Sequence, residues 1–150
     1  MLSHTAQYAL RGVLHIAASP PEGATRAAET AAALDVPEKY LARVLNTLAH
    51  AGVLRSRRGA KGGFRLARPA ADLSLAQIVA PFDAVGNAPR CLIRDQPCGS
   101  GEPCIAHAEW HAVAESVRRF FQNTTVADLL AGQALEDAAP VPHPSGNEAT

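Results

Sequence analysis

The segment from residue 37 to residue 68 most constrains how this chain can fold. Pro37 suits the first turn of a helix, and Gly52 stands where that helix would stop. Short strands are predicted at 53–57 and 64–68, because the Gly-rich stretch between them suits a β-hairpin tip. A helix that leads directly into a hairpin is therefore expected. The apolar stripe of this helix consists of Tyr40, Leu41, Val44, Leu45 and Leu48.

Two further helices are expected before this segment. Residues 6–17 carry apolar side chains at helical spacing, and Thr25 can cap a short Ala-rich helix over residues 26–34. Three helices followed by a hairpin are the layout of a winged helix-turn-helix, a mainly α fold with a small β-hairpin wing. In this fold the helix before the wing enters the DNA major groove. The candidate DNA contacts are Lys39, Tyr40 and Arg43 on that helix and Arg57, Arg58 and Lys61 on the wing.

The distribution of charge supports this interpretation. The whole chain is neutral, with 14 Lys and Arg against 14 Asp and Glu. Residues 37–68 nevertheless hold eight basic side chains and one acidic side chain, whereas residues 69–150 hold four basic and ten acidic. A strongly basic helix and hairpin favour binding to double-stranded DNA. The alternative is an ordinary solvated basic face.

The whole chain divides into four expected parts. Residues 1–84 form the DNA-binding domain, and Ser74 and Gln77 fit a capping box for its last helix. Residues 85–103 are predicted to be a loop that contains cysteines. Residues 104–135 are predicted to form a long helix, from about 104 to 122, and a short one over 126–130. Residues 136–150 are typical of a disordered tail.

The sequence predicts a cytoplasmic protein. It has no run of about 18 apolar residues, so no membrane span is expected. The apolar N-terminal stretch is interrupted by His4, Arg11 and His15, which favours an amphipathic helix over a signal peptide. Three cysteines are too few, and odd in number, for a secreted disulfide scaffold.

Three cysteines and one histidine form a second candidate site. Cys91, Cys98 and Cys104 lie close together in sequence, and His107 follows Cys104 by three residues. Cys104 and His107 are therefore expected to share a helix face at the first turn of the long helix. Thiolate and imidazole suit iron–sulfur clusters, zinc or copper, and these four ligands suffice for a 2Fe–2S cluster. A zinc site, a metal-free thiol redox switch and inert buried thiols remain alternatives. A Cys–His nucleophile would lack a third orienting group, so an enzyme is not expected.

Several of these stretches together resemble a known family. They are Gln7-Tyr8-Ala9-Leu10, Pro37-Glu38-Lys39-Tyr40-Leu41, the wing stretch over 48–67, and Cys104-Ile105-Ala106-His107-Ala108-Glu109-Trp110. They are similar to the opening helix, recognition helix, wing and last cluster ligands of IscR/NsrR-type regulators. These winged-helix transcription regulators make up the Rrf2 (Rrf-two) family. The resemblance covers residues 5 to about 132.

This resemblance implies a homodimer whose long helices cross antiparallel. Each subunit would present one recognition helix to half of a palindromic operator, with half-sites about 34 Å apart. By analogy with IscR, a 2Fe–2S cluster would be held by Cys91, Cys98, Cys104 and His107. Gln7 stands where the nitric-oxide-sensing branch has an acidic ligand, which favours His107 as the fourth ligand. The implied function is a repressor that senses redox, iron or nitric oxide status.

Overall fold

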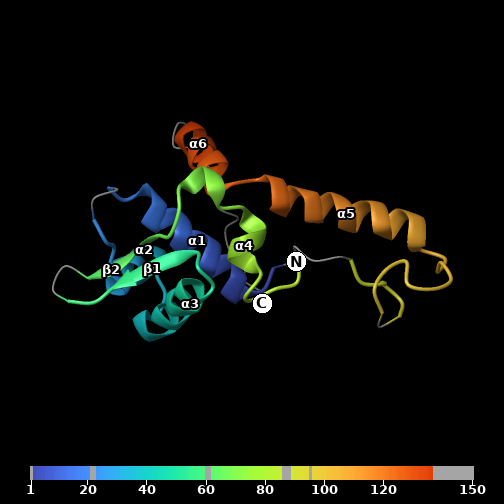
Figure 1. Cartoon of the computed structure of the whole chain (residues 1–150), viewed down its shortest axis with the longest axis horizontal. Coiled ribbons are helices and arrows are strands. Elements are labelled where there is room, and N and C mark those ends of the chain that lie inside the picture. The colour runs from blue at the N-terminus through green and yellow to red at the C-terminus, as the bar shows by residue number, and fades with distance from the viewer. Residues whose placement is uncertain (1, 21–22, 60–61, 86–88, 95, 137–150) are drawn as a thin grey trace, which may run out of the picture.

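A computed structural model describes residues 2–20, 23–59, 62–85, 89–94 and 96–136 of the chain (Figure 1). It confirms the expected mainly α fold with one two-stranded hairpin. The tail predicted to be disordered lies beyond residue 136, outside the described residues. In chain order the elements are α1 His4–Ala18, α2 Ala27–Leu34, α3 Glu38–His50, β1 Leu54–Arg57, β2 Gly63–Leu66, the 3₁₀ turn η1 Ala70–Asp72, α4 Leu75–Val79, α5 His107–Asn123 and α6 Val126–Glu136.

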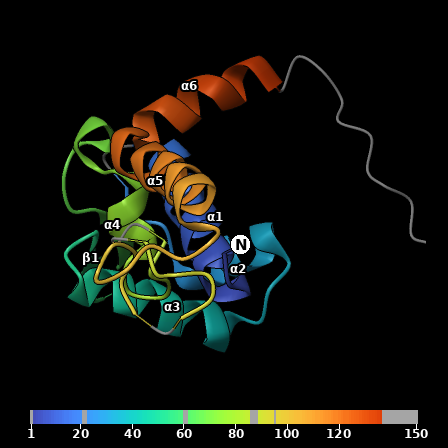
Figure 2. The same cartoon turned by 90° about the vertical axis from the view of Figure 1, so that its right-hand side faces the viewer.

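Helix α1 runs through the middle of the molecule. Its small and branched residues are buried, among them Ala6, Ala9 and Val13, which are fully inaccessible to solvent. It contacts α2, α3, α4, α6 and the hairpin. In Figures 1 and 2, α6 lies on one side of α1 and α3 on the opposite side. The core therefore extends from the recognition helix to the C-terminal helix through a single central helix.

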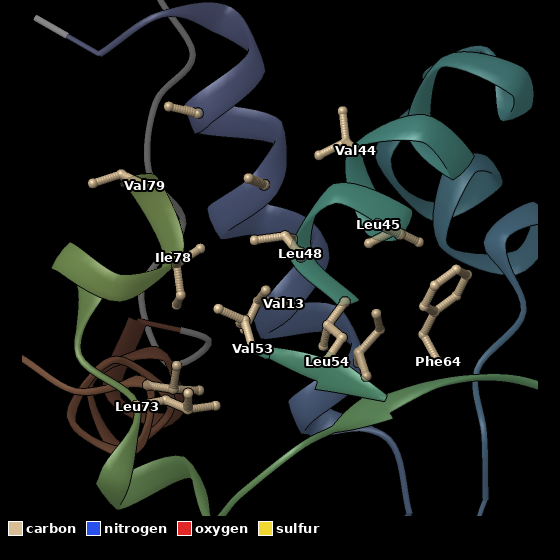
Figure 3. Packing of buried hydrophobic residues seen from close by; sticks show 14 of the residues in the cluster. Val13, Val44, Leu45, Leu48, Val53, Leu54, Phe64, Leu73, Ile78 and Val79 are labelled. Carbon is tan, nitrogen blue, oxygen red and sulfur yellow. The ribbon is translucent and has the colours of Figure 1, made fainter. Parts of the chain in front are cut away.

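Helix α3 buries one stripe in this core. Leu41, Val44, Leu45 and Leu48 are buried, and Leu48 lies beside Val53 at the start of the hairpin (Figure 3). This is the stripe expected from the sequence, except that Tyr40 is only half-buried. The opposite face of α3 is left to solvent and carries the polar residues.

Strand β2 is hydrogen-bonded on both of its edges. Strands β1 and β2 pair antiparallel, and Ser56 lies opposite Phe64. On the other edge of β2, Thr25 and Phe64 exchange backbone hydrogen bonds of 2.9 and 2.8 Å. The expectation that Thr25 caps α2 is therefore wrong. Helix α2 begins at Ala27, after a turn in which the Arg26 N–H donates to the Glu29 carboxylate.

The C-terminal helices continue the same core. The Leu75 N–H donates to the Thr124 carbonyl and the Val126 N–H donates to the Leu73 carbonyl, both at 2.9 Å. Phe121 of α5 and Val126 of α6 are buried beside α4. The rest of α5 projects away from the body of the molecule (Figure 1). None of the helices in the described part of the chain is long and apolar enough to cross a membrane.

Two helix boundaries differ from those predicted. Helix α5 begins at His107 instead of about residue 104, because the chain after Pro103 makes a turn in which the His107 N–H donates to the Cys104 carbonyl at 2.9 Å. Cys104 therefore lies outside the helix. Helix α6 continues to Glu136, six residues beyond its expected end.

Candidate functional site

The solvent-facing side of α3 carries a stripe of polar and basic residues. Lys39 and Arg43 are exposed and lie one turn apart. Asn46 and His50 continue the same stripe, at a spacing of three and four residues. The His50 ring is fixed because its Nδ1 lies 2.7 Å from the Asn46 carbonyl oxygen. Asn46 and His50 were not among the predicted contacts, although their spacing from Arg43 would have identified them.

Tyr40 is placed differently from Lys39 and Arg43. Its hydroxyl lies 2.7 Å from the Thr5 hydroxyl of α1, and its ring packs edge-on against Tyr8. These contacts fix the position of α3 relative to α1. Contact between Tyr40 and DNA stays a prediction.

The wing adds a second basic surface. Arg57 and Arg58 are exposed at the end of β1, while Lys61 lies outside the described residues. A hollow of about 530 Å³ joins these arginines to the exposed ends of Asn46 and His50. The wing tip and the C-terminal half of α3 therefore present one continuous polar surface.

The wing glycines have structural roles as well. A side chain at Gly63 would place its Cβ only 2.6 Å from the Thr25 carbonyl oxygen. Only glycine allows the strand to approach the Thr25 segment this closely. At the tip, the Gly62 N–H donates to the Gly59 carbonyl at 2.8 Å, which closes the turn.

The cysteine-containing loop lies at the free end of α5, away from α3 (Figure 1). Its backbone is held by short-range hydrogen bonds, because the Cys91 N–H donates to the Gln96 carbonyl and the Cys98 N–H donates to the Pro89 carbonyl, both at 2.8 Å. The Trp110 indole N–H donates to the Arg90 carbonyl at 2.7 Å. This last bond ties the loop to the first turn of α5.

The four predicted ligands are brought together as two pairs. The Sγ atoms of Cys91 and Cys104 lie 3.8 Å apart, and the Cys98 Sγ lies 3.4 Å from the His107 Nδ1. The expectation that Cys104 and His107 share a helix face is wrong, because α5 begins at His107 and Cys104 lies before it. All four are partly buried. No set of three or more donors among the described residues is arranged around a single metal ion.

These pair distances match what one tetrahedral metal requires of two of its ligands. With metal–sulfur bonds of about 2.3 Å and metal–nitrogen bonds of about 2.05 Å, a tetrahedral angle puts two sulfurs about 3.8 Å apart and a sulfur and a nitrogen about 3.5 Å apart. Two such pairs, side by side, fit a cluster with two metals and two protein ligands on each.

The thiols differ in acidity. The backbone N–H groups of Ile93 and Arg94 point at the Cys91 sulfur and hold the pKa of Cys91 below its ordinary value. Burial raises the pKa of Cys98, and the neighbouring Cys91 and Cys104 thiolates raise it further. The first effect favours a thiolate ligand at Cys91. The second effect keeps the Cys98 thiol protonated to a higher pH than the Cys91 thiol.

The sequence and the fold of this chain agree with those of known proteins. A family model described as "Rrf2: Iron-dependent Transcriptional regulator" matches residues 2–132. The chain belongs to the Rrf2 family. This Rrf2 protein is thus a winged-helix, DNA-binding transcription regulator and not an enzyme.

Two curated relatives illustrate the range of similarity. The HTH-type transcriptional regulator Rv1287 of Mycobacterium tuberculosis is 30% identical over 142 residues, which cover 92% of this chain and 86% of the relative. The HTH-type transcriptional regulator IscR of Photobacterium profundum is 26% identical over 136 residues, covering 91% of this chain and 78% of the relative. Both similarities extend over the wing and the cysteine-containing loop.

Two solved structures share the fold of this Rrf2 protein. CymR, the global cysteine regulator of B. subtilis, superposes with a TM-score of 0.75 at 23% identity and covers 88% of this chain and 97% of its own. IscR of T. potens superposes with a TM-score of 0.72 at 22% identity, covering 95% and 93%. Because both regulators have this fold, the fold alone does not identify the ligand of the cysteine-containing loop.

Proposed function

We propose that this Rrf2 regulator binds a palindromic DNA operator as a homodimer and holds a 2Fe–2S cluster on Cys91, Cys98, Cys104 and His107. The observation that carries the proposal is the arrangement of these side chains as two pairs, each at the ligand separation of one metal. When bound, the cluster supplies an iron centre that responds to oxidants, nitric oxide and iron supply.

The DNA contacts follow from the basic surface. Lys39 and Arg43 on α3, with Tyr40 beside them, are proposed to meet the major groove. Arg57, Arg58 and Lys61 of the wing are proposed to meet the phosphate backbone. In this proposal residues 1–84 form the DNA-binding unit, 85–103 the ligand loop and 104–135 the dimerisation part.

An apolar stripe on α5 supports dimerisation. Val113, Val117 and Phe120 recur at helical spacing on this projecting helix and are 58%, 41% and 52% exposed. Large apolar side chains rarely stay in water as a contiguous stripe unless a partner covers them. We propose that the same stripe of a second copy covers this one, because the two α5 helices can cross antiparallel and bury both.

The loop and α5 are proposed to transmit the state of the cysteines. When the four side chains are held together, the loop between Pro89 and His107 is drawn into one arrangement. The Trp110 bond to the Arg90 carbonyl passes this arrangement to the first turns of α5. Because α5 carries the dimer stripe, its position sets the distance between the two α3 helices. Only one distance matches the operator half-sites.

The test is the absorption spectrum and metal content of the full-length protein, isolated without oxygen. A coloured protein with iron and sulfide in equal amounts is expected, and His107→Ala should lose the colour. His111→Ala is the matched control, because His111 is exposed and its ring centroid lies 5.6 Å from that of His107. A colourless wild-type protein with one zinc per chain would refute the proposal.

A metal-free thiol switch is the second candidate. The contact between the Cys91 and Cys104 sulfurs favours it, because an external two-electron oxidant that takes two electrons and two protons from these thiols would join sulfurs that already lie 3.8 Å apart. The structural similarity to CymR is compatible with such a sensor. Purified protein without iron but with a reversible Cys91–Cys104 disulfide would select this function over the cluster.

A further inference from the structure

A second basic hollow lies behind the wing tip. It has a volume of about 600 Å³ and is bounded by the C-terminal end of α1, the outer face of the hairpin and the turn after β2. Arg55 of β1, Arg65 of β2 and Arg68 of the turn line it. Apolar side chains, including Ile16 and Leu66, form much of the remaining wall. None of these arginines belongs to the DNA contacts proposed above.

The guanidinium groups of these arginines have no compensating partner in the described part of the chain. Arg55 and Arg65 lie directly opposite each other in the hairpin register, and both are exposed. Like charges in this position destabilise a hairpin. Among the residues that the structure describes, none forms a hydrogen bond or an ion pair with the side chain of Arg55, Arg65 or Arg68. An anion bound between these side chains would offset their repulsion.

The negative groups near the hollow are few. No described acidic residue lines it. Glu29 lines an adjoining hollow, and Glu22 stands in the chain between two lining residues but lies outside the described part. The C-terminal end of α1 contributes a partial negative charge, which the three guanidinium groups outweigh.

We propose that Arg55, Arg65 and Arg68 form a binding site for a phosphoryl oxyanion. The planar guanidinium group donates two parallel hydrogen bonds to a pair of phosphate oxygens, which suits this ligand over a halide. Two sources can supply the group. One is a backbone phosphate of DNA that flanks the operator, and the other is free phosphate or a small phosphate ester.

The position of the site favours the DNA source. Arg57 lies on the same face of β1 as Arg55, about 6.7 Å further along the strand, and leads to the wing tip. The three arginines thus extend the wing surface by one step away from α3. This source rests on the proposed DNA-binding role of the wing, whereas binding of free phosphate does not.

The first experiment needs no DNA. Full-length protein, isolated without oxygen, is titrated with inorganic phosphate at constant ionic strength by calorimetry. Saturable binding is expected, and Arg65→Gln should weaken it at least tenfold. Arg55→Gln serves as a second variant if Arg65→Gln unfolds. Arg119→Gln is the control, because Arg119 is exposed on α5 and lines neither basic hollow.

The second experiment identifies the source. Duplexes selected by the protein are compared with and without about six extra base pairs at each end. If flanking DNA supplies the phosphate, Arg65→Gln lowers the slope of log affinity against log salt by about 1.8 on the long duplex, for two protomers, and leaves the short duplex unchanged.

Together the two experiments distinguish the two phosphate sources from each other and from the absence of an oxyanion site. Phosphate binding that Arg65→Gln weakens, with unchanged slopes on both duplexes, identifies a small phosphate compound as the ligand. No saturable phosphate binding together with unchanged slopes overturns the site. If the wild-type protein binds no duplex, the DNA-binding proposal fails, and the phosphate titration still decides whether the oxyanion site exists.

Discussion

The wing tip makes the most quantitative prediction. Arg58 is exposed at the end of β1 and lines the hollow shared with the C-terminal half of α3. If it contacts one phosphate, a dimer on a palindrome makes two such contacts. Arg58→Ala should then lower the slope of log affinity against log salt by about 1.8, at 0.9 for each phosphate.

The same slope can be restated as a change in relative affinity. Between 50 and 200 mM salt the affinity advantage of the wild type over Arg58→Ala should shrink by about 12-fold, since a fourfold change in salt is raised to the power of about 1.8. Fluorescence anisotropy with a labelled operator duplex measures both proteins across this range. Arg119→Gln, which removes the same charge from α5, should match the wild type.

Parallel lines of log affinity against log salt for the wild type and Arg58→Ala would contradict this prediction. If Arg58→Ala lowers affinity by the same factor at every salt concentration, Arg58 does not neutralise a phosphate. If it has no effect at any salt concentration, the wing tip does not meet DNA.

Three other predictions test separate parts of the molecule. Val117→Glu should shift the protein from dimer to monomer in sedimentation, because a charge would have to be buried in the α5 stripe; an unchanged dimer would place the interface elsewhere. Gly63→Ala should cost about 1–3 kcal/mol of unfolding free energy, measured in urea, because the new methyl group meets the Thr25 backbone at 2.6 Å; equal stability would contradict this close approach. In metal-free protein, alkylation of Cys91 should rise at lower pH than alkylation of Cys98, because the pKa of Cys91 is lowered and that of Cys98 is raised, and only the thiolate reacts; the reverse order would contradict both shifts.

The local elements of the fold could be predicted because their determinants are local. The apolar stripe of α3, the stop at Gly52 and the Gly-rich hairpin tip are all signals within a few residues, and each is confirmed. The capping box of Ser74 and Gln77 is confirmed for the same reason. Such signals depend on backbone geometry that neighbouring residues determine.

The elements that were mispredicted depend on distant residues. Thr25 looks like a helix cap, but its backbone pairs with Phe64, 39 positions later, and sequence spacing carries no trace of this bridge. For Thr25, a tertiary contact replaced the local interaction that the pattern favoured. Tyr40 was expected on the apolar stripe, and the contact of its hydroxyl with Thr5 of α1 is a further tertiary contact that spacing alone does not reveal.

The cysteine site also combines features that the local sequence predicts with features that depend on distant residues. The sequence indicated which four side chains lie together but not how they pair. The expectation that Cys104 and His107 share a helix face assumed that both lie on one helix. The turn after Pro103 instead moves Cys104 out of that helix and toward Cys91. This turn depends on the fold of the whole loop. The pairing, which carries the proposed cluster, became visible only in three dimensions.

The proposed role of the cysteine-containing loop is tested most directly by the operator affinity of one preparation before and after its cluster is removed. We expect at least a tenfold difference in affinity between the two states, equivalent to about 1.4 kcal/mol. Cys98→Ala is expected to bind the operator with the same affinity before and after the removal treatment. Equal affinities of wild-type protein before and after cluster removal would contradict the claim that the cysteine-containing loop controls DNA binding.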